Sequence, residues 1–196
     1  MAIRKTETFR CAAFPRRTAG VVLHVSSLPG PGPVGSLGAG ARAWIDCLAE
    51  AGFGWWQVCP LGPTGYGDSP YQPLSAFALN PYFIDLGELR EEGLLIGEEL
   101  AEIGDGEDSV DYGRLWTELR PLLGRAARRA AKDPSRLARW GDLEAFRTAE
   151  SSWLRDWERF SALREANGFR APSDWKAGEV DPEAGRAAAA LQQALA

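Results

Sequence analysis

"GVVLHV", residues 20–25, and "WWQVCPL", residues 55–61, are two apolar runs of strand length. A loop rich in Pro and Gly, residues 26–38, and a stretch with helical periodicity, residues 39–51, lie between them. Strand, helix and strand in this order predict a βαβ unit with parallel strands and a right-handed crossover. Both runs are almost continuously apolar, which is typical of parallel strands covered on both faces.

The helix expected at residues 39–51 carries its apolar side chains on one face. Gly52 is positioned to end it in the left-handed conformation. We expect this face to pack against the two strands. Its residues are Ala41, Trp44, Ile45, Leu48 and Ala49.

A small helix is predicted after an extended piece at residues 80–86. Asp85 and Glu88 have the spacing of a capping box, and Gly93 marks the end of the helix. Residues 97–111 are strongly acidic and predict an exposed linker. The Arg-rich face that follows is interpreted as solvated surface that offsets this linker; it comprises Arg125, Arg128 and Arg129.

Long helices dominate the rest of the chain. One is expected at residues 112–132 with a bend at Pro121, and a second at residues 134–167 with Gly168 as its stop. Residues 169–180 read as irregular, and residues 181–196 as an Ala-rich helix that is a poor core former. The second long helix carries a stripe that predicts helix packing: Phe146, Ala149, Trp153, Trp157 and Phe160.

Composition narrows the class of protein. The chain has 196 residues and a net charge of −5, from 22 basic and 27 acidic residues, which argues against nucleic acid and against an anionic membrane surface. The three cysteines, Cys11, Cys47 and Cys59, have no metal-binding spacing, and the basic N-terminus lacks a signal-peptide core. We therefore expect reduced thiols and a cytoplasmic protein.

The stretch "LGPTGYGDSPYQ", residues 61–72, is a polar and conformationally restricted loop directly after the second strand. Ligands of α/β proteins gather at the carboxyl ends of parallel strands, so this loop and residues 26–38 should border the same mouth. A sugar ring has an apolar face and a rim of hydroxyl groups. Tyr66 and Tyr71 offer rings for that face, while Ser69 and Gln72 both donate and accept hydrogen bonds. Asp68 is a further candidate contact.

The segments "RTAGVVLHVSSLPGPGPVGSLG" and "WWQVCPLGPTGYGDSPYQPLSAFALNPYFIDL" resemble the N-terminal part of the amylomaltases, which are 4-α-glucanotransferases, also called disproportionating enzymes. The later "WLRDWERFSALRE" resembles their long-helix insertion. The likeness covers roughly residues 17–180. Val25 stands where the family usually has Pro, and Leu79 where Gly is common.

This resemblance implies an α/β fold: the N-terminal portion of a (β/α)8 barrel, incomplete, with a long-helix insertion. Residues 1–17 would be a leader, residues 18–111 the first βαβ unit with its glucan-binding loop, and residues 112–196 a helical subdomain. The chain would end before the barrel is complete, since such barrels need about 250 residues.

The implied activity is transfer of α-1,4-glucan segments between maltooligosaccharides, without cofactor or metal. The implied substrate contacts are Tyr66, Asp68, Ser69 and Tyr71. The family's catalytic carboxylates lie in later motifs that do not occur here, and the only histidine is His24. No catalytic residue is therefore assigned, the chain alone is expected to be inactive, and its partner would be the missing C-terminal part of the enzyme.

Several alternatives stay open. The chain could be a non-catalytic glucan-binding fragment or a non-functional truncated product. The tyrosines could only cover the barrel end, and Asp68 could form an Asx-turn ahead of Ser69 and Pro70. His24 could be a core residue with one satisfied nitrogen. A serine hydrolase is disfavoured because no G-x-S-x-G motif is present, and a phosphate loop is disfavoured because prolines interrupt the glycines.

Overall fold

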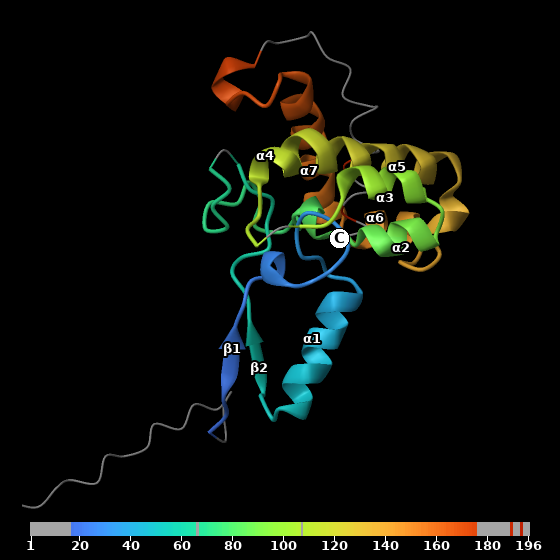
Figure 1. Cartoon of the computed structure of the whole chain (residues 1–196). Helices are drawn as coiled ribbons and strands as arrows, with labels where there is room; N and C mark the ends of the chain where they lie inside the picture. Colours follow the sequence, from blue (N-terminus) through green and yellow to red (C-terminus); the bar gives the residue numbers. More distant parts are fainter. Residues whose placement is uncertain (1–16, 66, 107, 176–188, 190–192, 194–196) are drawn as a thin grey trace, which may run out of the picture.

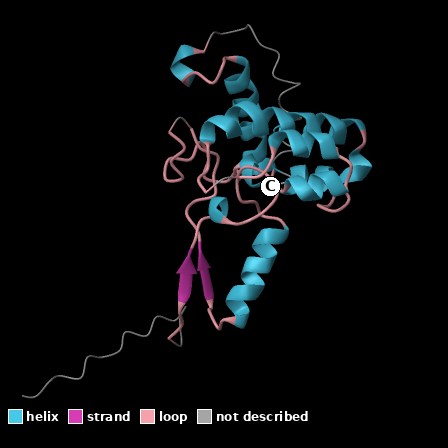
Figure 2. Cartoon of the chain, in the orientation of Figure 1, coloured by secondary structure: helices cyan, strands magenta, loops and turns pink. Residues whose placement is uncertain are grey.

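A computed structural model describes residues 17–65, 67–106, 108–175, 189 and 193. It contains a βαβ unit and a group of helices (Figures 1 and 2). The strands of the βαβ unit project from the helices, and their carboxyl ends face the helical part (Figure 1). The loops that leave these strands therefore lie at the junction between the two parts.

The two strands are parallel, as predicted. β1 (Gly20–Val22) pairs with β2 (Trp55–Gln57), with Val21 opposite Trp56. Both are shorter than the apolar runs that predicted them. Leu23 still donates to the Gln57 carbonyl at 3.1 Å and His24 is extended, and a 3-10 turn, Val25–Ser27, then ends the extended backbone.

The crossover helix α1 (Ala39–Glu50) begins where it was expected, and Gly52 follows it with a φ of +78°. Its predicted apolar face is only partly buried. Ala41 and Leu48 are buried, whereas Ile45 and Ala49 are exposed, contrary to prediction. A pair of short strands covers only a narrow part of a helix, so the described residues leave the rest of this face open.

The small helix α2 (Leu86–Glu91) confirms the predicted cap, because Asp85 accepts the Glu88 N–H at 3.0 Å. Gly93 adopts the expected left-handed conformation, with a φ of +68°. The Glu88 carboxylate does not return the capping bond among the described contacts. It pairs with Arg42 of α1 instead and so ties α2 to the crossover helix.

The acidic segment is largely exposed, as expected, but residues 97–103 form a helix and not a linker. α3 (Gly97–Ile103) buries Ile103 in the helical core. Glu99 accepts hydrogen bonds from Arg125 and Arg129 of α5 at 2.9 and 2.6 Å. Two of the three arginines assigned to solvated surface are therefore structural partners of this segment.

The first long helix is continuous but irregular. It comprises α4 (Tyr112–Arg114), a π-helical turn (Leu115–Leu119) and α5 (Arg120–Lys132). The wide turn places the Arg120 N–H on the Leu115 carbonyl. Pro121 has no N–H for the usual bond one turn back, which explains why the irregularity directly precedes it.

The second long helix is not one helix, contrary to prediction. After a 3-10 turn (Pro134–Leu137), Gly141 has a φ of +108° and Asp142 caps α6 (Leu143–Ala149). A further break separates α6 from α7 (Ser151–Ala166), which Gly168 follows with a φ of +63°. The expected aromatic stripe is only half-buried, and the fully buried positions of α7 are Leu154, Glu158 and Ala162.

The described residues contain two apolar clusters. The smaller one lies in the βαβ unit around Val25, Leu28, Ala41 and Phe83. The larger one lies between the helices and is built almost entirely of Leu and Ala. The Ala-rich C-terminal segment falls outside the described residues except for Ala189 and Gln193. None of the described helices is long and apolar enough to cross a lipid bilayer.

Candidate functional site

The loop after β2 folds back on itself. The Leu74 N–H donates to the Pro63 carbonyl at 2.8 Å, and Thr64 forms a bridge with Pro73. At the tip, Asp68 has a φ of +52°, which Asp tolerates better than most residues. The bonds that join residues 63–64 to residues 73–74 explain how so polar a loop keeps a fixed shape without belonging to a helix or sheet.

The structure gives different positions to the four predicted contact residues. Tyr66 lies outside the described residues. Asp68 and Ser69 are half-buried, and the Asp68 carboxylate accepts the Thr64 hydroxyl at 3.3 Å. Tyr71 is 73 % exposed, and its hydroxyl lies 3.6 Å from the Cys59 sulfur, to which it donates. The Asp68 side chain shows no Asx-turn to a described backbone N–H, so that alternative is not supported.

A small cavity of about 20 Å³, which we call the strand-end hollow, lies where the strands end. His24, at the end of the first apolar run, and Ser26, in the first loop, line it on one side, and Asp68 and Pro70 line it from the second loop. The expectation that the two loops border one mouth is met by these residues. Ser69 and Tyr71 do not line the hollow, although Tyr71 directly follows Pro70 on its rim. The other lining residues are Val34, Pro60, Gly62, Thr64, Asn80, Tyr82, Phe83, Tyr112 and Leu115.

Two tyrosines of the strand-end hollow were missed by sequence reasoning. Burial raises the pKa of Tyr82, and the nearby Asp68 charge raises it further while Arg120 lowers it. Burial and the Asp68 charge also raise the pKa of Tyr112. Both phenols therefore stay protonated at neutral pH and line the same hollow as the Asp68 carboxylate. Tyr82 follows Asn80 and Pro81, and Tyr112 begins a helix. At neither position does the sequence distinguish a tyrosine that lines a site from one that only packs in the core.

His24 lies in the same hollow, with its ring edge against Phe83 at a centroid distance of 5.4 Å. Burial lowers the pKa of His24, so the imidazole is neutral at pH 7. Its Nδ1 atom is buried and has no hydrogen-bond partner among the described residues. The alternative of a core residue with one satisfied nitrogen stays open, because it requires a partner for only one of the two ring nitrogens.

Asp85 fixes the first loop against the helices. Ser36 donates to its carboxylate at 2.6 Å, and both residues are buried. The same carboxylate caps α2. One side chain therefore joins residues 26–38 to the helical part and holds one border of the hollow.

A family model described as 4-alpha-glucanotransferase matches residues 23–196. The chain belongs to the 4-alpha-glucanotransferase family. It is 47 % identical over 152 residues to a 4-alpha-glucanotransferase from Thermus thermophilus, covering 78 % of this chain and 30 % of that relative. A relative of the same name from Streptococcus pneumoniae is 39 % identical over 176 residues, covering 89 % of this chain and 34 % of that protein.

Solved structures agree with the family assignment. The amylomaltase from Streptococcus agalactiae, determined in complex with acarbose, matches with a TM-score of 0.79 and 32 % identity. The match covers 91 % of this chain and 38 % of that protein. The chain thus spans about a third of the length of the glucanotransferases it matches.

The described lining of the strand-end hollow combines side chains that bear hydroxyl groups with one carboxylate. Asp68 is the only carboxylate among its described lining residues, and retaining glycoside chemistry uses two carboxyl groups about 5–5.5 Å apart. Within the described part of the chain, no group of three or more His, Cys, Asp or Glu side chains could hold a metal ion.

Proposed function

We propose that this chain supplies part of the glucan-binding surface of a 4-α-glucanotransferase. The carrying observation is that a member of this family has an exposed Tyr71 directly after Pro70, which lines the hollow where the loops of both parallel strands meet. The related amylomaltase that was solved with acarbose supports a carbohydrate ligand. Maltooligosaccharides are the substrates we propose, with Tyr66, Asp68, Ser69 and Tyr71 as contacts.

The chemistry of the rim fits a sugar. The exposed Tyr71 ring offers an apolar surface for the C–H face of a glucose unit. The Asp68 carboxylate accepts hydrogen bonds from sugar hydroxyl groups, and its bond from Thr64 restricts its orientation. Because the loop is already closed by its backbone bonds, less conformational entropy is lost when the glucan binds.

We infer that the reacting carboxylates come from outside this chain. Transfer by a retaining enzyme requires one carboxylate that attacks the anomeric carbon and one carboxylic acid that protonates the departing oxygen. The sugar 4-hydroxyl of the acceptor then takes the place of water. This chain would bind and orient the glucan, while residues elsewhere in the enzyme perform both proton transfer and attack.

The exposed faces and edges of the two strands fit a chain that forms only part of the enzyme. Val22 and Trp55 are 67 % and 49 % exposed, and β1 and β2 each have one unpaired edge in the described sheet. We propose that further strands of a (β/α)8 barrel pair with these edges, so that residues 18–111 form the first unit of the barrel and residues 112–196 a helical insertion. The free Cys47 and Cys59 fit a cytoplasmic location.

The chain alone is expected to bind maltooligosaccharides weakly and not to disproportionate them. Incubation with maltotriose, followed by chromatography for glucose and longer oligosaccharides, tests the second part. Transfer products from the purified chain would show that it contains the carboxylates, and Asp68→Asn would then be the first variant to assay. Binding without turnover would also fit a non-catalytic glucan-binding fragment. If mixing with a separately produced C-terminal part restores turnover, that alternative is excluded.

A further inference from the structure

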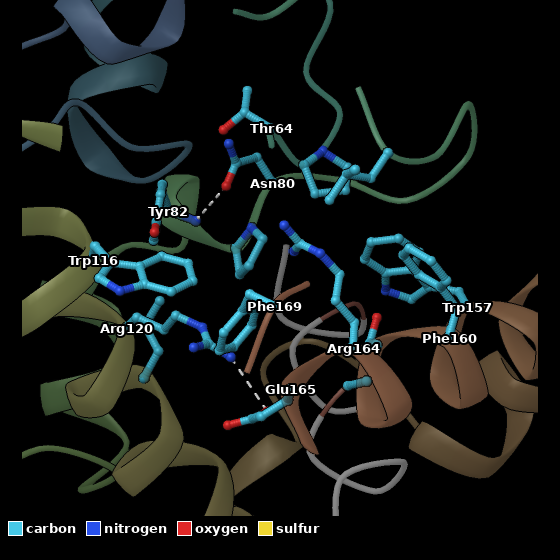
Figure 3. A pocket seen from close by; sticks show the side chains of 16 residues that line it. Thr64, Asn80, Tyr82, Trp116, Arg120, Trp157, Phe160, Arg164, Glu165 and Phe169 are labelled. Atoms are coloured by element: carbon cyan, nitrogen blue, oxygen red, sulfur yellow. Dashed lines mark hydrogen bonds and ion pairs between the residues drawn. The ribbon is translucent and has the colours of Figure 1, made fainter. Parts of the chain in front are cut away.

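A second cavity lies between the loop after β2 and the helices, away from the strand edges. Its volume is about 110 Å³, enough for several water molecules. Figure 3 shows side chains from the loop, from the π-turn and α5, and from α7 and the residues after it converging on this space. We call it the helical cleft and define it by Asn80, Tyr82, Trp116, Arg120, Arg164 and Phe169.

Two guanidinium groups border the helical cleft, but only one has a carboxylate partner among the described residues. Arg120 pairs with Glu165 at 3.3 Å and stacks on the Phe169 ring, with its Cζ atom 3.9 Å from the ring centroid. The Cζ atom of Arg164 lies 5.2 Å from the same ring. No ion pair to Arg164 is formed within the described chain. Among the residues that the structure describes, the cleft therefore has one more positive than negative charge.

The two guanidinium groups are partly buried. Burial lowers the pKa of both Arg120 and Arg164, and the charge of Arg120 lowers the pKa of Arg164 further. Both guanidinium groups stay protonated because arginine titrates far above neutral pH. A partly buried cation beside a like charge is unfavourable unless an anion compensates it.

The uncommitted polar groups of the cleft are mainly donors. The Asn80 side-chain oxygen already accepts the Tyr82 N–H at 3.1 Å, and Asn80 is only 6 % exposed. The Ser161 hydroxyl, which also lines the cleft, is buried without a described partner. A neutral sugar needs acceptors as well as donors, whereas an oxyanion only accepts. The donor excess therefore favours an anion over a second glucan.

We propose that the helical cleft binds a phosphoryl group, with Arg164 and Arg120 donating to its oxygens. Guanidinium groups recognise phosphate through paired, charge-assisted hydrogen bonds. The volume suits a group of this size rather than a whole oligosaccharide. The ligand is either inorganic phosphate or the phosphate of a sugar monoester, whose organic part would lie against the Trp116 ring. This site is separate from the glucan contacts proposed above and does not depend on them.

The test uses the full 196-residue chain at micromolar concentration and constant ionic strength. Thermal unfolding is followed by circular dichroism with inorganic phosphate, glucose 6-phosphate, glucose or additional sodium chloride. Both phosphates should raise Tm, and glucose and chloride should not. A larger shift with glucose 6-phosphate identifies a monoester as the ligand, and equal shifts identify free phosphate. Broadening of the ³¹P resonance of phosphate by the wild-type chain gives an independent measure of binding.

Matched variants locate the site. Arg164→Gln should weaken phosphate binding by about tenfold or more, since hydrogen bonds to charged groups contribute about 1.5–3 kcal/mol. Arg159→Gln, which removes the same charge from an exposed position of α7, should leave binding unchanged. Arg164→Lys should bind at an intermediate level, because it keeps the charge but loses the paired donors.

The stability of the Arg164→Gln variant without phosphate distinguishes phosphate binding by Arg164 from a purely structural role of this side chain. Removing an uncompensated charge should leave the Tm of the ligand-free Arg164→Gln chain unchanged or raise it. A clear loss of Tm without phosphate, together with no phosphate response of the wild type, would show that a carboxylate of the chain itself neutralises Arg164 and would overturn the proposal. If Arg159→Gln weakens phosphate binding as much as Arg164→Gln does, the binding depends on net charge and not on the cleft, and the proposal is also overturned.

Discussion

Tyr71 is highly exposed and directly follows Pro70, which lines the strand-end hollow, so a role in binding can be measured separately from a role in folding. Tyr71→Ala should weaken maltooligosaccharide binding by about two- to tenfold, the equivalent of an aromatic contact of about 0.5–1.5 kcal/mol. The free energy of unfolding should change by less than about 0.5 kcal/mol, because exposed side chains contribute little.

Titration calorimetry and urea unfolding measure the two quantities for Tyr71. Tyr71→Phe is the matched control: it keeps the ring and loses only the contact with the Cys59 sulfur, so it should bind almost as wild type does. A Tyr71→Ala chain that loses stability but binds normally would favour a tyrosine that only covers the barrel end.

Asp85 shows the opposite behaviour, since it is buried and serves two partners. Asp85→Ala should lower the free energy of unfolding by about 2–4 kcal/mol, because it removes a helix cap and leaves the buried Ser36 hydroxyl without its acceptor. Asp46→Ala, on the exposed side of α1, should change it by less than about 0.5 kcal/mol. Chemical denaturation compares the pair, and similar values for both would mean that Asp85 is not the anchor of the first loop.

At the scale of elements, Glu99 fastens α3 to α5 and makes their association depend on pH. Hydrogen bonds, above all that from Arg129, hold the pKa of Glu99 at about 2, although burial opposes this shift. The unfolded value is about 4.3, so the stabilisation is complete above that pH and is lost as the pH falls toward 2. Because both arginines are partly exposed, we expect about 1–3 kcal/mol rather than the full electrostatic value.

Glu99→Gln should therefore destabilise the chain at pH 7 and lose less stability than wild type between pH 5 and pH 2. Urea unfolding at a series of pH values measures this. Glu98→Gln, the exposed neighbour, supplies the control and should follow the wild-type curve. If the two variants behave alike, the Glu99 contacts do not hold α3 in place.

Local signals predicted the ends of elements better than their lengths. Gly52, Gly93 and Gly168 all follow helices in the left-handed conformation, because a positive φ is a property of a single residue. The break at Gly141 was missed because the residues on either side have helical patterns and a lone glycine is tolerated within a helix. In the folded chain Asp142 caps a new helix there, so the residues before and after Gly141 need not share one helix axis.

The whole chain exposes apolar side chains on its βαβ unit, which predicts a measurable surface property. Val22, Ile45 and Trp55 are 67 %, 50 % and 49 % exposed. The folded chain should bind a hydrophobic dye below its unfolding temperature, and Ile45→Lys should reduce the dye signal without lowering Tm.

Ile96→Lys is the control for this surface, since Ile96 is 47 % exposed but belongs to the helical part. It should leave the dye signal nearly unchanged. A dye-free, fully monomeric wild-type chain would argue that the βαβ face needs no further strands, and it would weaken the incomplete-barrel proposal.

The sequence by itself determined the βαβ unit, the cap at Asp85 and the family motif around Asp68, because each depends on residues that are close together along the chain. The tertiary structure decided which distant residues meet. It turned part of the acidic segment into a helix held by Glu99, and it brought Tyr82 and Tyr112 to the same hollow as Asp68. It also placed Arg164 beside Arg120 and Phe169. Contacts of this kind depend on how helices pack around a shared core, and no periodicity or spacing within one segment records that packing.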